Sequence, residues 1–217
     1  MSKVLVTGSA AGIGKAVCEL FLGRGHQVVG MDKAPSSIQH PAYEHVQHDI
    51  SDRNYPALEG IEILVNNAGQ QQMDERDIEV NLTSTIALTE FYAFHVGIRA
   101  VVNVSSASAI SGSEFPHYAA SKGGLNAYTR NIALRLASYG ATANSICPGG
   151  VITDLNRHIL EDEALYKQVL NESLLHRWAQ PEEIAEWIYF LAVVNHSMTG
   201  ENLLIDNGEM LRSNFVW

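Results

Sequence analysis

Short apolar runs alternate along the chain with segments in which apolar residues recur every three or four positions. Continuous runs of this length predict buried β-strands, and the wider spacing predicts amphipathic helices. The predicted strands cover residues 4–6, 26–31, 43–48, 61–66, 100–104, 141–146 and 203–205. The predicted helices cover residues 15–22, 80–94, 118–138, 161–170 and 181–194.

This alternation indicates the fold class. Strands that are apolar along their whole length and separated by helices are typical of a parallel sheet buried between two helical layers. We predict an α/β fold, a doubly wound parallel sheet of about seven strands with helices on both faces. No linker rich in Pro, Ser or Gly divides the 217 residues, so residues 1–217 are expected to form a single domain.

Charge and cysteine content narrow the function. The chain has 14 Lys and Arg against 24 Asp and Glu, a net charge of −10, which argues against nucleic acids or anionic lipid as partners. Its two cysteines, Cys18 and Cys147, are too few for a disulfide framework. No apolar run is long enough to cross a bilayer, and the first residues lack the apolar region of a signal peptide. We therefore expect a soluble cytoplasmic protein.

A glycine-rich turn, TGSAAGIG at residues 7–14, lies between the first predicted strand and the first predicted helix. Gly8, Gly12 and Gly14 let the backbone turn tightly and approach a pyrophosphate, while the N–H groups that begin the helix bind the anion. Asp32, at the end of the second predicted strand, is placed to accept hydrogen bonds from both hydroxyls of an adenosine ribose. The turn therefore predicts a dinucleotide site.

The residues around Asp32 bear on the choice between NAD and NADP. The carboxylate would repel the 2′-phosphate of NADP. Lys33 is a neighbouring cation that could tolerate this phosphate, but Ala11, just before the middle glycine, supplies no second cation. We therefore favour NAD over NADP.

Further motifs follow in a fixed order along the chain. After TGSAAGIG come NNAG (66–69), VNVSS (102–106), YAASK (118–122), CPGGVIT (147–153), RWAQPEEIA (177–185) and MTGENLLIDNG (198–208). Together these motifs resemble the classical short-chain dehydrogenase/reductase family, and the resemblance covers essentially the whole chain. It implies a Rossmann fold, a nicotinamide dinucleotide cofactor and hydride transfer between an alcohol and a carbonyl compound.

The resemblance also implies four catalytic positions. Tyr118 matches the acid/base, Lys122 the lysine four residues later, and Ser106 the serine that holds the substrate oxygen. Asn81 matches the fourth position, which would anchor a water that relays protons from Lys122. Ser105 gives the family's usual spacing to Tyr118, whereas Ser106 is the motif's second serine, which usually serves. Adjacent residues of a strand point to opposite faces, so only one of the two can act, and we choose Ser106.

The predicted cofactor contacts follow the predicted strands. By resemblance, Asp49 and Ile50 contact the adenine, and Val151 and Thr153 contact the nicotinamide. The full predicted set is Gly8, Ala11, Gly12, Ile13, Gly14, Asp32, Lys33, Asp49, Ile50, Asn67, Ala68, Gly69, Tyr118, Lys122, Pro148, Gly149, Val151 and Thr153.

The spacing of Tyr118 and Lys122 supports their roles independently of the resemblance. Residues four apart lie on one face of a helix. A phenol has an unperturbed pKa of about 10, which is too high for a base at neutral pH. A nearby lysine cation and the nicotinamide cation would both lower this pKa. A serine hydroxyl can donate a hydrogen bond to the carbonyl oxygen as negative charge develops there.

The connections between motifs are shorter than usual in the family. Only 16 residues separate Asp49 from Asn66, and Pro56 lies among them. The usual crossover helix is therefore expected to be short or absent. Only 11 residues separate Gly69 from Asn81, which places the rim of the active site in doubt.

Two features outside the motifs are interpreted separately. His40, His45 and His48 lie close in sequence, but no Cys or carboxylate at zinc spacing accompanies them, so no metal is predicted. The tail 211–217 ends in Phe-Val-Trp, and an apolar terminus is costly to expose. We expect it to pack against another subunit, in a homo-oligomer of two or four copies as is common in the family.

These observations together predict an enzyme. We expect hydride transfer between a nicotinamide cofactor and a small or medium secondary alcohol or its ketone, with residues 154–176 as a lid over this substrate. A 3-oxoacyl thioester and a sugar or polyol remain alternative substrates, because no motif fixes the lid side chains. A dinucleotide sensor without turnover is the alternative from another class, although a sensor does not need all four catalytic positions.

Overall fold

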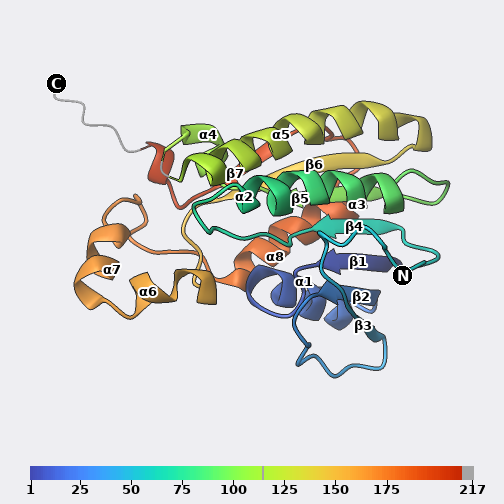
Figure 1. Cartoon of the computed structure of the whole chain (residues 1–217), viewed down its shortest axis with the longest axis horizontal. Coiled ribbons are helices and arrows are strands. Elements are labelled where there is room, and N and C mark those ends of the chain that lie inside the picture. Colours follow the sequence, from blue (N-terminus) through green and yellow to red (C-terminus); the bar gives the residue numbers. More distant parts are fainter. Residues whose placement is uncertain (114, 212–217) are drawn as a thin grey trace.

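The computed structural model describes residues 1–113 and 115–211. At its centre lies a sheet of seven strands in the order β3-β2-β1-β4-β5-β6-β7 (Figure 1). The strands are β1 (Lys3–Thr7), β2 (Gln27–Asp32), β3 (Tyr43–Gln47), β4 (Ile63–Asn66), β5 (Ala100–Val104), β6 (Thr142–Pro148) and β7 (Asn202–Ile205). Every neighbouring pair is parallel. The predicted fold class and number of strands are confirmed.

Helices cover both faces of the sheet (Figure 1). The four that form these layers are α1 (Gly12–Gly23), α3 (Thr85–Tyr92), α5 (Pro116–Leu136) and α8 (Pro181–Tyr189). Because side chains alternate along a strand, Val4 and Val6 of β1 pack in one core with α1 and α8. Leu5 packs in the other core with α3 and α5. Burial on both faces explains why the strands are apolar along their length.

Two of the predicted helices, those over 80–94 and 181–194, are divided in the structure, because each contains a π-helical part, which in the second covers Phe190–Val194. The shorter helical elements are α2 (Arg76–Ile78), a π-helix (Glu79–Ser84), α4 (Ser108–Ser111), α6 (Arg157–Leu160) and α7 (Glu163–Leu170). The helix predicted over 80–94 begins earlier, and its first part is the π-helix that contains Asn81. The helix predicted over 161–170 begins at Glu163, because the Asp162 carboxylate caps it by accepting the N–H of Leu165 at 3.0 Å.

The connection between β3 and β4 contains no helix, so the predicted loss of the crossover helix is confirmed for these described residues. Two tyrosines fill the space instead. The Tyr55 hydroxyl donates to the carbonyl of Ile50 at 2.9 Å, and its ring centroid is 6.1 Å from that of Tyr92. Tyr92 of α3 donates to the carbonyl of Pro56 at 2.6 Å. These contacts hold the loop against the helix layer.

The segment with α6 and α7 projects beyond the edge at which the strands end (Figure 1). It is the segment predicted to form the lid. Residues 114 and 212–217 lie outside the described residues, and so does most of the tail predicted to pack against another subunit. Among the helices of the described ranges, none has the length and apolar character needed to cross a membrane.

The loop that replaces the crossover helix should depend on Tyr92. Tyr92→Phe removes the hydrogen bond to Pro56 and should lower the free energy of unfolding by about 1 kcal/mol. Urea denaturation of both proteins measures this difference. Tyr139→Phe is the matched control, because Tyr139 is more than a third exposed and should change nothing. Equal losses in the two variants would contradict the prediction.

Candidate active site

The strands bring the predicted site residues to one edge of the sheet. Because the strands are parallel, their carboxyl ends lie there together. Asp32 ends β2, Pro148 ends β6, and Ser106 lies two residues beyond β5. The first turns of α5 bring Tyr118 and Lys122 to the same edge, where the lysine contacts the end of β5.

The turn between β1 and α1 requires glycine at two positions. Gly8 has a φ of +67°, in the left-handed region that favours glycine. At Gly14, a Cβ would overlap the carbonyl oxygen of Gly8 and the side chain of Asn67. The helix begins at Gly12, and no side chain caps it at Ala11, so its first N–H groups are available to an anion. The turn therefore fits a pyrophosphate.

The NNAG segment after β4 holds this turn in place. The Asn67 side chain donates to the carbonyls of Thr7 and Gly8 at 3.1 and 3.0 Å. The Thr7 hydroxyl accepts the backbone N–H groups of Asn67 and Ala68 at 3.0 Å each. The structure thus brings the predicted contacts Asn67 and Ala68 to the glycine turn, where the amide of Asn67 fixes the shape of the turn.

Asp32 connects the glycine turn to the segment that follows β2. Its two carboxylate oxygens accept the N–H groups of Ala10 at 3.0 Å and Ala34 at 2.9 Å. Lys33 is exposed, and its carbonyl accepts a hydrogen bond from the Gln47 side chain at 3.0 Å. The carboxylate is therefore fixed in orientation beside the turn, while the Lys33 side chain extends into solvent.

The predicted adenine contacts Asp49 and Ile50 differ in environment. The Asp49 carboxylate accepts the N–H and the hydroxyl of Ser51 at 3.0 and 2.8 Å. The backbone hydrogen bond is the main cause that lowers the pKa of Asp49. Ile50 is buried in the core with Leu5 and Met31, so its side chain supports this end of the sheet from within.

Tyr118 and Lys122 lie on one face of α5, as their spacing predicts. The Lys122 Nζ is 5.7 Å from the centroid of the Tyr118 ring. It donates to the carbonyl of Val104, the last residue of β5, at 2.8 Å. Lys122 is only 4% exposed. A charged ammonium is thus held at the end of the strand, away from water.

Burial sets the protonation of this pair. It lowers the pKa of Lys122 to about 8 and raises the pKa of Tyr118 above its usual value. The hydroxyl of Ser106 lowers the pKa of Tyr118 by hydrogen bonding, but by less than burial raises it. Desolvation of the phenolate is the largest effect of the chain's own groups on this pKa, and the expectation that Lys122 and a nicotinamide cation together lower it stays a prediction.

The structure separates the two candidate serines. Ser105 is buried, and its hydroxyl donates to the backbone carbonyl of Lys122 at 3.1 Å. Ser106 lies within hydrogen-bonding reach of the Tyr118 phenol. It also accepts the N–H of Ser108 at 3.1 Å. The position of Ser106 beside Tyr118 favours it over Ser105, whose hydroxyl supports α5 instead.

Asn81 fastens the NNAG segment to α5. Its side-chain oxygen accepts the N–H of Gln70 at 2.8 Å. Its amide donates to the carbonyl of Gln70 at 2.9 Å and to the hydroxyl of Ser121 at 3.1 Å. A Cβ at Gly69 would approach the Asn81 oxygen to 3.1 Å and Lys122 Nζ to 3.4 Å. Both amide hydrogens of Asn81 are used, and its role in a proton relay stays a prediction.

The turn after β6 is tied to the lid by two contacts. Trp178 packs so closely on Gly150 that a Cβ there would overlap the indole. The ring of Tyr166, on α7, meets this indole edge-on at 5.8 Å. The carbonyl of Val151 accepts the side chain of Asn156 at 2.9 Å. The predicted nicotinamide contact Val151 and the lid are thus linked, and the sequence did not indicate Trp178 as part of this link.

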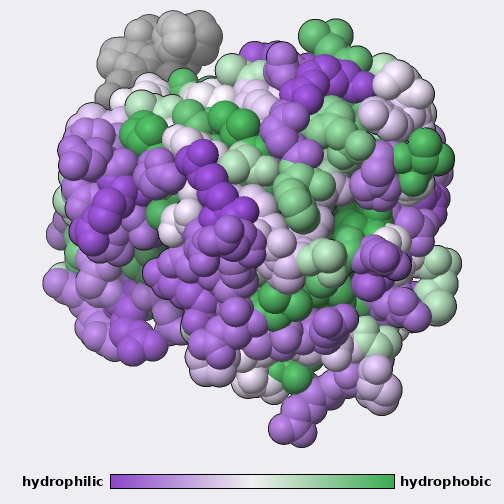
Figure 2. All heavy atoms as spheres, turned by 45° about the vertical axis from the view of Figure 1, so that its right-hand side comes forward, coloured by the Kyte–Doolittle hydropathy of each residue, from purple (hydrophilic) through white to green (hydrophobic). Residues whose placement is uncertain are grey.

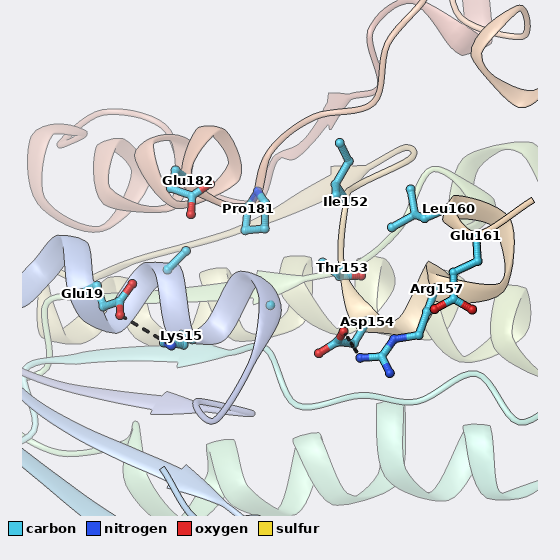
Figure 3. A pocket seen from close by; sticks show the side chains of 12 residues that line it. Lys15, Glu19, Ile152, Thr153, Asp154, Arg157, Leu160, Glu161, Pro181 and Glu182 are labelled. Carbon is cyan, nitrogen blue, oxygen red and sulfur yellow. Dashed lines mark hydrogen bonds and ion pairs between the residues drawn. The ribbon is translucent and has the colours of Figure 1, made fainter. Parts of the chain in front are cut away.

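A pocket of about 480 Å³ opens between α1, the turn after β6 and the lid (Figure 3). Gly12 and Thr153, both predicted cofactor contacts, line it and face each other closely, since a Cβ on Gly12 would lie 3.3 Å from the threonine methyl. Arg157 and Asp154 form an ion pair on the lid side. Tyr118 does not line this pocket, so the pocket lies apart from the proposed catalytic pair.

Asp77 is a site residue that the predicted elements did not include. It is fully buried on α2 and raises the pKa of both Tyr118 and Lys122. Its spacing of four residues from Asn81 was the available signal, because such residues share a helix face.

The three neighbouring histidines contact backbone groups. His40 accepts the N–H of Ala42 at 3.1 Å, and the rings of His45 and His48 form hydrogen bonds with the carbonyls of Ala34 and Asp52. Across residues 1–113 and 115–211, no group of three or more His, Cys, Asp or Glu side chains is placed to hold a metal ion.

Known proteins resemble this chain over almost its whole length. A family model described as enoyl-(acyl carrier protein) reductase matches residues 8–209. Glucose 1-dehydrogenase of Gluconobacter oxydans is 30% identical over 98% of this chain and 93% of its own length. The 3-oxoacyl-[acyl-carrier-protein] reductase of Vibrio cholerae is 30% identical over 94% of this chain and 95% of its own length. The solved aldohexose dehydrogenase of Thermoplasma acidophilum has a TM-score of 0.88 at 26% identity, covering 100% of this chain and 96% of that one.

The chain belongs to the classical short-chain dehydrogenase/reductase family. It is an NAD(P)-dependent oxidoreductase that acts on alcohol or carbonyl groups. The predicted family and reaction class are confirmed. The substrates named for its relatives differ from one another, from aldoses to acyl thioesters of a carrier protein.

The glycine turn can be tested by one added methyl group. Gly14→Ala places a Cβ against the Gly8 carbonyl and should weaken NADH binding at least about tenfold, or ~1.4 kcal/mol. Calorimetric titration with NADH measures this loss. Gly23→Ala, at the other end of α1, is the matched control because its Cβ would meet nothing within 4 Å. Unchanged affinity in a folded Gly14→Ala protein would refute the assignment of the turn.

The buried lysine predicts a pH dependence of stability. Its folded pKa of about 8 lies below the ~10.4 of an unfolded lysine. Between these values the unfolded chain binds the extra proton, so stability rises with pH. We expect wild type to gain up to about 1.4 kcal/mol per pH unit over Lys122→Met in this window. Urea denaturation at several pH values measures the difference, and a constant difference would show that Lys122 titrates normally.

Proposed function

We propose that this site transfers hydride between a nicotinamide cofactor and a secondary alcohol or its ketone, through Ser106, Tyr118, Lys122 and Asn81. The pairing of half-buried Tyr118 with buried Lys122 on one face of α5, with Ser106 beside the phenol, is the observation that carries this proposal. The pair lies at the same edge of the sheet as the glycine turn, which supports a dinucleotide between them.

Each side chain has a distinct task in this proposal. Tyr118 takes the hydroxyl proton of an alcohol during oxidation and returns it to a ketone during reduction. Ser106 donates a hydrogen bond to the substrate oxygen as negative charge develops on it. Lys122, when protonated, stabilises the phenolate of Tyr118 by its charge. A bound nicotinamide dinucleotide supplies the hydride donor or acceptor, and its ring cation adds to the charge of Lys122.

NAD is the preferred cofactor in this proposal. The Asp32 carboxylate is held by the N–H groups of Ala10 and Ala34 at the position expected for the adenosine ribose. Its charge disfavours a 2′-phosphate. Lys33 is exposed and Ala11 adds no second cation, so Asp32 is the charged group held against the turn.

We further propose that residues 1–217 form one catalytic domain in which residues 154–176 close over the substrate. Buried free cysteines and a negative net charge support a cytoplasmic location. Phe91, Leu134 and Trp187 are exposed on three different helices, and apolar patches interrupt a mostly polar surface (Figure 2). These side chains support a homo-oligomer of two or four copies.

A sugar or polyol and a 3-oxoacyl thioester remain candidate substrates beside simple alcohols. The aldose dehydrogenases and the oxoacyl reductase among the relatives support these alternatives. Apolar Leu155 and Leu174 and cationic Arg157 all belong to the lid, so its composition alone favours no single class. The substrate panel described next separates them.

The proposal predicts that Tyr118→Phe loses turnover. Wild type and variant would be assayed with NADH and NADPH against ketones, aldehydes, sugars and oxoacyl thioesters. We expect a rate loss of at least about a hundredfold in the variant, the usual range for a positioned acid or base. We also expect a higher kcat/KM with NADH than with NADPH.

The outcomes separate the candidates. Turnover that survives in Tyr118→Phe would remove Tyr118 as the acid/base. A preference for NADPH would overturn the proposed role of Asp32. Tight NADH binding without turnover on any substrate would favour the dinucleotide sensor.

A further inference from the structure

Asp77 is a buried carboxylate without an ion-pair partner among the described residues. It is 0% exposed, and its two oxygens accept the backbone N–H groups of Gln72 at 2.9 Å and Met73 at 3.2 Å. Arg76, next to it in sequence, pairs instead with the accessible Asp74 at 2.7 Å. Burial of an uncompensated carboxylate is costly, so a charge of opposite sign is expected nearby.

The helix that carries Asp77 packs directly on α5. Asp77 and Asn81 are four residues apart, which places them on one face of the continuous α2 and π-helical segment. Asn81 on this face contacts Ser121 of α5 at 3.1 Å. The hydroxyl of Ser121 in turn donates to the carbonyl of Tyr118 at 2.7 Å. Asp77 is therefore buried against the turn of α5 that bears the proposed catalytic pair.

Lys122 is the one buried lysine or arginine of the described chain. Its ammonium makes a hydrogen bond to the Val104 carbonyl, which is neutral. Asp77 and Lys122 are thus two buried ionisable side chains for which no ion pair is found among the described residues, and α2, which carries Asp77, packs on α5, which carries Lys122.

We propose that Asp77 is a positioning residue, the buried counter-charge that keeps the Tyr118–Lys122 pair protonated. This inference rests on the proposed function, because the pair matters only if it exchanges protons with substrate. Asp77 does not touch the reacting atoms in this proposal. Its charge acts on both members of the pair, and its oxygens fix the backbone by accepting the N–H groups of Gln72 and Met73.

Few polar or titratable groups act on the pKa values of Tyr118 and Lys122 from the elements packed around them. Ser106, after β5, lowers the pKa of Tyr118, whereas Asp77 and Cys147 of β6 raise it. Asp77 and Cys147 also raise the pKa of Lys122 against the larger effect of burial. His117, on the first turn of α5, is exposed and acts on Asp74 rather than on the pair.

The charge therefore has a definite signature. A negative charge favours the protonated form of both the phenol and the ammonium, so removing it lowers both pKa values. Such coupled groups give two apparent pKa values that belong to the pair, and both should move in the same direction. A purely structural role for Asp77 would change the rate or the stability without shifting both limbs of the pH profile of kcat/KM together.

Asp77→Asn tests this signature. The pH profile of kcat/KM would be measured for oxidation, with NAD, of the alcohol that corresponds to the best carbonyl substrate of the panel. Both limbs should move to lower pH by roughly 0.5–1 unit, as expected for a charge at short range in a partly polar interior. Asp77→Ser is a second neutral variant, in case the amide disturbs folding, and should shift the limbs likewise.

Two controls sharpen the experiment. Asp74→Asn removes a carboxylate three residues away whose side chain is 40% exposed, and it should leave both limbs in place. Asp77→Glu keeps the charge and should restore the wild-type limbs even if the rate falls. Folded Asp77→Asn and Asp77→Ser proteins with wild-type limbs would overturn the inference.

A readout without activity separates this inference from the proposed function. In Asp77→Asn, the rise of stability with pH that belongs to Lys122 should begin at lower pH than in wild type. This shift, measured by urea denaturation against Lys122→Met backgrounds, supports the counter-charge even if Tyr118→Phe keeps its turnover. Inactive Tyr118→Phe together with an unshifted Lys122 transition would leave the proposed function standing and refute the role of Asp77.

Discussion

The hydrogen bond from the Lys122 ammonium to the Val104 carbonyl lies where α5 crosses the end of β5. A cation held there away from water is costly, and a neutral carbonyl offsets only part of that cost. Neighbouring hydrogen bonds fix the position of the Lys122 segment of α5 against β5. Ser105 holds the carbonyl of Lys122 at 3.1 Å, and Asn81 holds α5 one residue earlier through Ser121. The end of β5, α5 and the π-helix at Glu79–Ser84 are therefore held together around the Lys122 ammonium.

The fold could be predicted from the sequence because the apolar pattern of each strand agrees with the burial that the whole sheet requires. Strands that are apolar at nearly every position can be buried only between two helical layers. Helices that connect successive strands make those strands parallel, as β1 is with β2 and β4. The division of the predicted 80–94 helix could not be predicted. The π-helix surrounds Asn81, whose partners Gln70 and Ser121 are 11 and 40 residues distant in sequence.

The motifs also gave the positions of the site, but not its protonation. Tyr118 and Lys122 share a helix face because of their spacing, which sequence shows directly. Their pKa shifts come from burial, and burial depends on how α2, β5 and β6 pack around α5. For the same reason the sequence did not indicate Asp77. Its environment, with only backbone N–H partners, exists only in the folded chain.

The indole of Trp178 rests on Gly150 and is met edge-on by Tyr166 of the lid. It is 7% exposed, whereas Trp187 on α8 is 42% exposed. The emission of these two tryptophans should therefore differ in wavelength and in access to quenchers. Indole emission overlaps the absorption of a reduced nicotinamide, and Trp178 lies beside the turn expected to hold that ring. The fluorescence of Trp178 should therefore report on the contact between the proposed lid and the turn after β6.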